Sequence, residues 1–344
     1  MFSCSLCKTI TGFVIILIIL ACSNGVYQNE KPVSIIFDTD MTTDCDDAGA
    51  LAMLHALERK GEAKILATVV NNMGEYSSGA TAAINAFYNR PDIPVGAYQG
   101  DRVGRDAADF FADIALDKES YGHAASARNQ FPDAVEVYRK VLAEAGQHEV
   151  VIVSVGHLNN LYDLLHSEAD QYSELNGVQL VEEKVDHLVV MGGHYLPQRS
   201  ERYPYGREHN FRARGSAEFT GTALEKWPTR IVLSGYEIGE NILTGTRLTE
   251  LDENHPVRYA YAHHPSEPLI NGRMSWDQTA ILAAVRDPEL YWDLSEPGWV
   301  EVDDEGYNTW TSDPEGMHVY LIERNNPDPS EIADIIENLM LGMR

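Results

Sequence analysis

The chain has 344 residues, of which 44% are hydrophobic and 23% charged, a composition that is ordinary for a globular protein and excludes a disordered or collagen-like chain. Fifty-three acidic residues against 26 Lys and Arg give a formal net charge of −27. Because this charge repels polyanions and no basic patch interrupts it, we expect no nucleic-acid partner.

Residues 1–21 are expected to be an export signal. Lys8 precedes the apolar run Phe13–Leu20, which is too short to span a membrane. The segment Ile19–Cys22 then resembles the lipobox of bacterial lipoproteins, whose cysteine carries the lipid. We therefore expect Cys22 to anchor the protein to a bacterial membrane, on the periplasmic side of the outer membrane, and residues 22–31 to form a short tether. A plain signal peptide or an uncleaved anchor is the alternative.

Residues 32–344 are expected to form a single domain in which short β-branched runs alternate with helical segments. The expected strands are Val33–Phe37, Ile65–Val70, Glu149–Ser154, Val185–Met191 and Arg230–Ser234; the expected helices are Asp47–Leu57, Ala80–Tyr88, Asp133–Ala145, Leu158–His166 and Ser216–Lys226. This order predicts an α/β fold with a mostly parallel central sheet, related to the Rossmann fold, and helices on both faces.

The end of the domain has a different pattern. Short strands with Gly and Asp turns between Val300 and Tyr320 predict a hairpin. The segment Ser330–Leu341 has the pattern of an amphipathic helix, and Ser330 is the expected cap.

An acidic loop follows the first expected strand and holds the best candidates for chemistry. Five carboxylates lie within ten residues, at Asp38, Asp40, Asp44, Asp46 and Asp47. Such close like charges either point into water or are held together by a cation, and oxygen ligands without His or Cys favour Ca²⁺ or Mg²⁺. In parallel α/β sheets ligands bind at the carboxyl ends of the strands, which is where this loop lies.

The loop resembles the Asp-x-Asp-Pro-Gly-x-Asp-Asp-Ala motif of the nucleoside hydrolase family of the inosine/uridine-preferring type. This chain has Asp38-Thr-Asp40, a loop that is two residues longer and lacks Pro-Gly, and then Asp46-Asp47-Ala48. The resemblance implies that Asp40 is the general base and a calcium ligand, that Asp46 accepts a ribose hydroxyl, and that Asp47 is a calcium ligand. The longer loop leaves Asp44 as a rival for the role of Asp46.

Further segments in the same order support this resemblance along nearly the whole domain. Asn72 ends the second strand, where the family places an asparagine in the ribose pocket. The segment Val153–Asn160 is similar to the family's Gly-Pro-Leu-Thr-Asn, which implies a calcium-binding carbonyl at Val155. Two more segments complete the set: Glu208-His-Asn210 resembles the family's Glu-Phe-Asn, which holds ribose hydroxyls, and Asp277 in Ser275-Trp-Asp277 would be the third calcium carboxylate.

The resemblance implies calcium-dependent hydrolysis of the N-glycosidic bond of ribonucleosides or a related N-riboside, by a chain that commonly forms homo-oligomers. The leaving-group side departs from the family, because Trp276 stands where a histidine is expected. Trp276 either stacks on the nucleobase or packs in the core. The histidines that could replace the missing acid are His157, His194, His209, His263 and His264, and Tyr195–Arg207 is expected to form a flap near the pocket.

The sequence leaves two other functions open. Asp38-Thr-Asp40-Met-Thr42 also fits the start of haloacid-dehalogenase-like phosphohydrolases, with Asp38 as nucleophile and Mg²⁺ as cofactor. Alternatively, the chain is a lipoprotein that binds nucleosides or sugars with calcium and has lost turnover. The sequence does not rank purines against pyrimidines.

Overall fold

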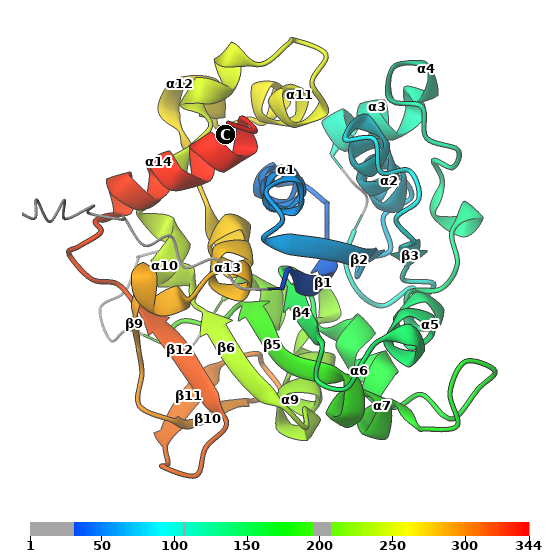
Figure 1. Cartoon of the computed structure of the whole chain (residues 1–344), viewed down its shortest axis with the longest axis vertical. Helices are drawn as coiled ribbons and strands as arrows, with labels where there is room; N and C mark the ends of the chain where they lie inside the picture. The colour runs from blue at the N-terminus through cyan, green and yellow to red at the C-terminus, as the bar shows by residue number, and fades with distance from the viewer. Residues whose placement is uncertain (1–30, 106–107, 196–207, 344) are drawn as a thin grey trace, which may run out of the picture.

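The computed structural model describes residues 31–105, 108–195 and 208–343. Its centre is a ten-stranded sheet in the order β11-β10-β12-β6-β5-β4-β1-β2-β3, with the short β9 paired to β12 (Figure 1). The strands are β1 (Val33–Thr39), β2 (Ala63–Val70), β3 (Val95–Ala97), β4 (Val150–Ser154), β5 (Val185–Met191), β6 (Arg230–Ser234), β9 (Asp293–Leu294), β10 (Gly298–Val302), β11 (Asn308–Ser312) and β12 (His318–Ile322). The pairs from β12 through β6 to β3 are parallel, so their carboxyl ends share one edge.

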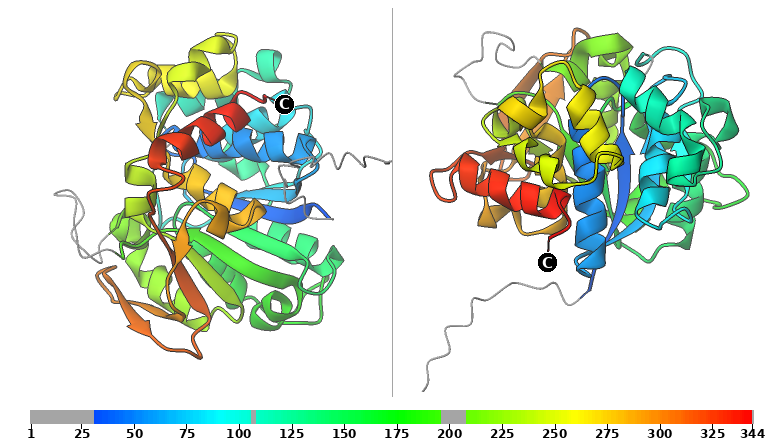
Figure 2. Two further views of the ribbon diagram at one scale, coloured as in Figure 1. Left: turned by 60° about the vertical axis from the view of Figure 1, so that its left-hand side comes forward. Right: turned by 90° about the horizontal axis from the view of Figure 1, so that it is seen from above.

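Helices cover both faces of this sheet, as the alternating sequence pattern predicts (Figure 1). One face carries α1 (Asp46–Arg59), α2 (Ser77–Phe87), α3 (Asp109–Leu116), α11 (Pro256–His263), α13 (Trp276–Val285) and α14 (Pro329–Met340). The other carries α5 (Ala134–Glu144), α6 (Asn159–Leu165), α7 (Gly177–Lys184) and α9 (Ala217–Lys226). Each face has its own hydrophobic core, and Figure 2 shows α14 lying against α1.

The fold also contains several shorter elements. They are the helices α4 (Lys118–Tyr121), α8 (His209–Arg212), α10 (Tyr236–Glu240) and α12 (Pro268–Asn271), and a separate two-stranded sheet of β7 (Leu243–Thr244) and β8 (Arg273–Met274). Within the described ranges, no helix combines the length and the apolar character needed to cross a membrane.

The alternation of side chains along β1 decides where its acidic residues point. Ile35 and Phe37 belong to the core beneath α1 and α13, whereas Ile36 belongs to the core beneath α5 and α6. Asp38 has the same parity as Ile36 and receives hydrogen bonds from Tyr138 of α5 and from residues of β2's end and α6. The carboxylates that follow the strand, beyond Thr39, therefore have to be placed by the loop and by α1.

The fold confirms the expected mostly parallel sheet, and the expected strands and helices are found with boundaries shifted by up to three residues. β10 and β11 form the expected antiparallel hairpin, and β12 pairs antiparallel with β10 on one side and parallel with β6 on the other. The cap of the last helix is Asp328 rather than Ser330, because the Asp328 carboxylate accepts from the amides of Ser330 and Glu331 while Pro329 occupies the first helical position.

The sequence pattern did not reveal the elements between residues 95 and 130, the helices α7, α8 and α10 to α13, or the short strands β7 to β9. The export signal, the tether and the lipid-bearing Cys22 fall in residues 1–30, which lie outside the described residues, as do positions 196–207 of the expected flap. The last residue of the tether, Lys31, is described: its ammonium group pairs with Glu149 at 2.8 Å, at the amino end of β4.

Candidate active site

A cavity of about 320 Å³ opens at the carboxyl ends of the parallel strands. Its walls come from the loop after β1, the ends of β4 and β5, the starts of α1, α8, α10 and α13, and β8. The lining residues are Asp40, Thr42, Thr43, Asp44, Asp46, Asp47, Arg105, Val155, Met191, Glu208, His209, Asn210, Tyr236, Arg273, Trp276 and Asp277. Eight of the nine site residues named from the sequence line this cavity, and Asn72 is the exception.

Three carboxylates meet in this cavity. One oxygen from each of Asp46, Asp47 and Asp277 lies within 4.8 Å of the other two, and all three side chains are buried. At such distances ionised carboxylates repel one another by roughly 3 kcal/mol per pair at an effective dielectric constant of about 20. Burial and then the neighbouring carboxylates raise the pKa of all three well above its usual range.

Two helices aim their positive ends at these carboxylates. Asp46 and Asp47 begin α1, and Asp277 is the second residue of α13, which packs against α1. A helix N-terminus stabilises an anion by up to about 2 kcal/mol. Two termini offset less than half of the roughly 10 kcal/mol of mutual repulsion among three ionised groups, so this arrangement calls for either protons or a cation. The oxygen-only ligand set is the chemistry that a hard divalent cation prefers.

Asp40 and Asp47 are oriented by the loop that joins β1 to α1. The Asp47 carboxylate accepts from the hydroxyl of Thr39 and, at 3.0 Å, from the amide of Met41, whose positive φ of 41° turns the loop back over the helix end. The hydroxyl of Thr42 donates to Oδ2 of Asp40 at 3.0 Å. Burial raises the pKa of Asp40 to about 6, although the hydrogen bond from Thr42 opposes this.

The structure also brings the more distant predicted residues to this edge. Val155 follows β4, and its carbonyl accepts from Nδ2 of Asn210 at 3.1 Å. Glu208 caps α8 and accepts from the backbone amides of Gly193, Asn210 and Phe211. Burial raises the pKa of Glu208 to about 7 despite these hydrogen bonds.

Asn72 lies apart from the other predicted site residues. It is fully buried beneath the acidic loop, where its amide donates to the backbone carbonyl of Asp40 and its Oδ1 accepts from the amide of Gly74. Among the described residues around the cavity it is not part of the lining. Its contact in the structure is therefore with the loop that carries Asp40, and a ribose contact of Asn72 stays a prediction.

Asp44 and Asp46, the two rivals for the ribose contact, differ in their partners. Asp44 is held by Arg273, with Nε at 2.8 Å from Oδ1 and Nη2 on Oδ2, and His264 lies 3.6 Å from the same carboxylate. Asp46, in contrast, has no side-chain hydrogen bond within the described part of the chain. Asp46 is thus the carboxylate that a ligand in the cavity can engage.

Trp276 both lines the cavity and packs into the protein. Its ring nitrogen donates to the carbonyl of Tyr236 at 2.9 Å, and the two rings stack with centroids 5.2 Å apart. The guanidinium of Arg273 lies 5.1 Å from the Trp276 ring centroid. Of the five candidate histidines only His209 is among the described residues that line this cavity; His263 and His264 line an adjoining one.

Asp38 does not support the phosphohydrolase interpretation. Its carboxylate is fully buried on the α5 and α6 side of the sheet and accepts from Tyr138 at 2.7 Å, from Asn71 at 2.6 Å and from Asn160 at 3.4 Å. A nucleophile has to reach substrate, and Asp38 is absent from the described lining of the cavity. Its hydrogen bonds instead tie the ends of β1, β2 and α6 together.

Sequence reasoning did not single out Arg105, Tyr236 or Arg273 as site residues. Tyr236 had a usable signal, since it follows β6 by two residues and strand ends meet at this edge. Arg273 lies four residues before Asp277, but an isolated arginine carries no motif. Arg105 follows β3 by eight residues, so no local pattern connects it to the site.

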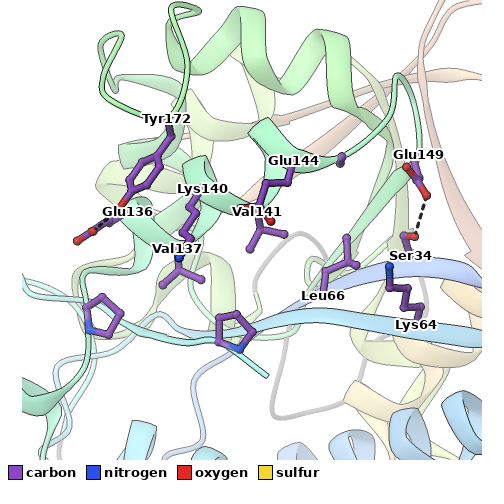
Figure 3. Close-up of a pocket in the computed structure, with 13 residues that line it drawn as sticks. Ser34, Lys64, Leu66, Glu136, Val137, Lys140, Val141, Glu144, Glu149 and Tyr172 are labelled. Atoms are coloured by element: carbon purple, nitrogen blue, oxygen red, sulfur yellow. Dashed lines mark hydrogen bonds between the residues drawn. The ribbon is translucent and has the colours of Figure 1, made fainter. Parts of the chain in front are cut away.

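A second cavity lies at the opposite, amino-terminal edge of the strands (Figure 3). It measures about 560 Å³ and lies between α5 and the starts of β1 and β2. Two of its acids are paired: Tyr172 donates to Glu136 at 2.8 Å, and Glu149 binds Lys31 and accepts weakly from Ser34. We call it the rear groove; it gathers no cluster of buried acids among the described residues.

The chain is similar to a known protein family and to solved structures. The family model of the inosine-uridine preferring nucleoside hydrolases matches residues 35–333. No curated protein sequence matches the chain. Similar solved structures include a plant nucleoside hydrolase, PpNRh1, with 18% identity, a TM-score of 0.62 and coverage of 90% of this chain and 99% of that one.

Two further structures share the fold. The inosine-uridine preferring nucleoside hydrolase of Bacillus anthracis has 15% identity, a TM-score of 0.64 and coverage of 90% of this chain and 99% of that one. The type III effector protein XopQ, solved with adenosine diphosphate ribose, has 14% identity, a TM-score of 0.64 and coverage of 92% and 96%. At these identities the structures show a shared fold.

Proposed function

The chain belongs to the inosine-uridine preferring nucleoside hydrolase family, and from this premise we propose that it hydrolyses the N-glycosidic bond of ribonucleosides or related N-ribosides in a calcium-dependent reaction. The observation that carries the proposal is the group of three buried carboxylates, Asp46, Asp47 and Asp277, gathered at two helix N-termini inside a cavity. A cation would compensate the charge of such a cluster, which otherwise has to hold protons.

The side chains present fit calcium. Asp40, Asp47, Asp277 and the carbonyl of Val155, which all line the cavity, would hold the ion; the carboxylates whose oxygens lie within 4.8 Å of one another are Asp46, Asp47 and Asp277. All are hard oxygen donors, which Ca²⁺ takes in numbers of six to eight, so solvent and ribose hydroxyls would complete its shell. When bound, the cation would neutralise the carboxylates and act as a Lewis acid toward oxygen ligands.

Asp40 is the proposed general base. Thr42 occupies its Oδ2, which leaves Oδ1 to accept a proton from the attacking water. Burial raises the pKa of Asp40 to about 6 in the metal-free protein, and a cation bound beside the carboxylate would favour its ionised form, which is the form that accepts a proton. Asn72 supports this geometry by holding the carbonyl of Asp40 from below.

Glu208, Asn210 and Asp46 are the proposed anchors of the ribose hydroxyls. Glu208 and Asn210 are fixed by backbone hydrogen bonds at the start of α8 and reach the cavity with little rotamer freedom. Hydrolysis of a glycosidic bond proceeds through an oxocarbenium-like transition state, and binding of remote hydroxyls stabilises the distorted sugar that leads to it. The proposed division is therefore sugar on the carboxylates and base toward Trp276 and Tyr236.

The test uses the purified protein with inosine, guanosine, adenosine, uridine and cytidine, and chromatography of the released base. We expect calcium-dependent release from at least one nucleoside and a loss of about 10³-fold for Asp40→Asn. Asp186→Asn, an exposed aspartate at the other end of β5, is the matched control and retains activity. Calorimetric binding of nucleosides without any release would overturn turnover and leave a binding protein.

We also propose that the protein is exported and lipidated at Cys22, since its amino-terminal sequence has the order of a bacterial lipoprotein signal. Mass spectrometry of the amino-terminal peptide from a membrane fraction tests this. An acylated Cys22 is the expected result. An unmodified chain that begins at Met1 and leaves the membrane in high salt would contradict it.

A further inference from the structure

Arg273 occupies the wall between two adjoining cavities. It lines the candidate active site and also a neighbouring cavity of about 870 Å³, which is bordered by α3 and the segment after α11. Thr43, Asp44 and Arg105 are shared in the same way. A ligand that extends from the carboxylates toward the second cavity therefore has to pass the guanidinium of Arg273.

The guanidinium is rigidly fixed. Nε and Nη2 form a bidentate pair with the Asp44 carboxylate, and the ring of Trp276 lies beneath the group. The side chain is only 12% exposed. Although burial acts in the opposite direction, the hydrogen bonds and charge of Arg273 lower the pKa of Asp44, so this pair persists through the neutral range.

This pairing leaves part of the donor set for a ligand. A guanidinium has five N–H donors and no acceptor. Asp44 takes one from Nε and one from Nη2, and the other described partner is the sulfur of Met274, 3.5 Å from Nη1. The remaining N–H groups can engage only an atom that accepts hydrogen bonds.

The cavity has two chemically different sides. Asp46, Asp47, Asp277 and Glu208 provide an anionic side that suits sugar hydroxyls and a cation. Tyr236, Trp276 and Arg273 provide an aromatic and cationic side, which suits a planar heterocycle. The base of a bound nucleoside is therefore expected next to Arg273.

We propose that Arg273 is a catalytic residue that stabilises the departing nucleobase as an anion and selects oxo bases, such as hypoxanthine, guanine and uracil, over amino bases. The inference rests on the proposed hydrolase function. It replaces the acid that the family resemblance leads one to expect at position 276, where this chain has Trp276.

The proposed step breaks one bond and forms another. The bond between C1′ and the base nitrogen breaks, and its electron pair stays on the base. The water oxygen bonds to C1′ and gives one proton to Asp40. Arg273 keeps its protons, because its pKa is too high for proton transfer, and donates hydrogen bonds to the anionic base. The base then takes a proton from solvent after release.

The selectivity follows from donor and acceptor geometry. A carbonyl oxygen on the base accepts from the guanidinium, and it also carries part of the charge when the base departs. An exocyclic amino group at the same position is a donor and meets donors only, which leaves both groups unpaired. The expected preference is thus for inosine over adenosine and for uridine over cytidine.

The experiment compares Arg273→Gln and Arg273→Lys with a matched control, Arg286→Gln. Arg286 follows the other end of α13 and forms the same kind of bidentate pair with Glu62, at 2.7 and 3.0 Å. The substrates are inosine, adenosine and 4-nitrophenyl riboside, whose leaving group departs readily without assistance. The measured quantity is kcat/KM for each substrate.

We expect Arg273→Gln to lower kcat/KM for inosine by about 10²-fold, and to lower it by less than about fivefold for adenosine and for 4-nitrophenyl riboside. Arg273→Lys should recover only part of the loss, because an ammonium lacks the planar fork. Arg286→Gln should leave all three within about twofold. Equal losses of Arg273→Gln on all three substrates, or no loss on inosine, would overturn the assignment.

A binding measurement separates this assignment from the hydrolase function. If the unaltered protein releases base from no nucleoside, the hydrolase proposal fails by itself. Calorimetry with free hypoxanthine and free adenine in the presence of calcium then tests Arg273 directly. Tighter binding of hypoxanthine that is lost in Arg273→Gln supports the assignment, whereas an absent preference or one that survives the substitution overturns it.

Discussion

The two cavities at opposite edges of the sheet differ in the burial of their acidic side chains and in the direction in which the pKa of these side chains is shifted. The rear groove is the larger, at about 560 Å³ against about 320 Å³. Its acids lie at the surface, and the hydrogen bond from Lys31 lowers the pKa of Glu149. In the active-site cavity burial raises the pKa of Asp277 and Glu208. Buried acids, rather than the size of a cavity, therefore mark the site.

The substitution with the largest expected effect removes one of the buried acids. Asp277→Asn should lower kcat/KM for the preferred nucleoside by about 10³-fold, because the cation loses a charged ligand. The same substitution should raise the thermal midpoint of the calcium-free protein, since it removes like-charge repulsion. Base release and thermal unfolding with a chelator measure the two effects.

The expected loss of activity and the expected rise of the thermal midpoint have opposite signs. A substitution that only disrupts the fold would lower both the activity and the midpoint. A fall in the midpoint of the calcium-free variant together with lost activity would contradict the idea that Asp277 is an uncompensated charge. Loss of activity with an unchanged response of the midpoint to calcium would contradict its role as a ligand.

The pH dependence of stability should differ between the two cavities. The folded-state pKa of Glu208 is raised from 4.5 to about 7, so its contribution is fully present below about pH 4.5 and is lost as pH rises toward 7. At about 1.4 kcal/mol per pH unit, this amounts to about 3 kcal/mol. Urea unfolding of Glu208→Gln in the presence of chelator should therefore show a flatter profile between these pH values than the unaltered protein.

Glu149 in the rear groove should behave in the opposite sense. Its pKa is lowered, so it contributes stability above its unfolded-state pKa and loses it as the pH falls. The difference between unaltered protein and Glu149→Gln should thus grow with rising pH. A Glu208→Gln profile as steep as that of the unaltered protein would show that burial does not raise the pKa of Glu208 as described.

A buried acid that has partners provides an intermediate case. Asp38 is fully buried like Asp277, but Tyr138, Asn71 and Asn160 donate to it. Tyr138→Phe removes one donor and should lower the free energy of unfolding by about 1–2 kcal/mol, with kcat/KM changed by less than about fivefold. Denaturant titration and base release measure these, and an activity loss as large as that of Asp277→Asn would place Asp38 in the site after all.

The smallest effect is expected at the rear groove. Lys31→Ala removes an exposed ion pair with Glu149, and such pairs are worth at most about 1 kcal/mol. Activity with every nucleoside should be unchanged. A clear loss of activity on this substitution would show instead that the rear groove is coupled to the reaction.

Much of this molecule follows from sequence patterns. The alternation of β-branched runs and helical segments gave the parallel sheet, and the family resemblance named Asp47, Val155, Glu208 and Asp277, which line one cavity. Alternation within β1 also separates Asp38 from the loop acids, although the sequence alone left Asp38 open as a nucleophile. The physical reason is that period-two alternation fixes the side of a strand residue only once the two cores are assigned.

Other features depend on contacts between distant segments. Asp44 is paired because β8 carries Arg273 to it across 229 positions of the chain. The Asn72 side chain lies beneath the Asp40 loop and not in the cavity, because its amide donates to the backbone carbonyl of Asp40. Neither contact has a local sequence signal, because both are set by how the loop closes over the helix ends.

The most direct test of the central claim is removal and return of the cation. The protein is treated with chelator, its calcium content is measured, and base release from inosine and uridine is followed while calcium is added back. We expect activity to disappear with the metal and to return with about one calcium per chain. Full turnover in protein that holds less than about one tenth of a calcium per chain would contradict the account.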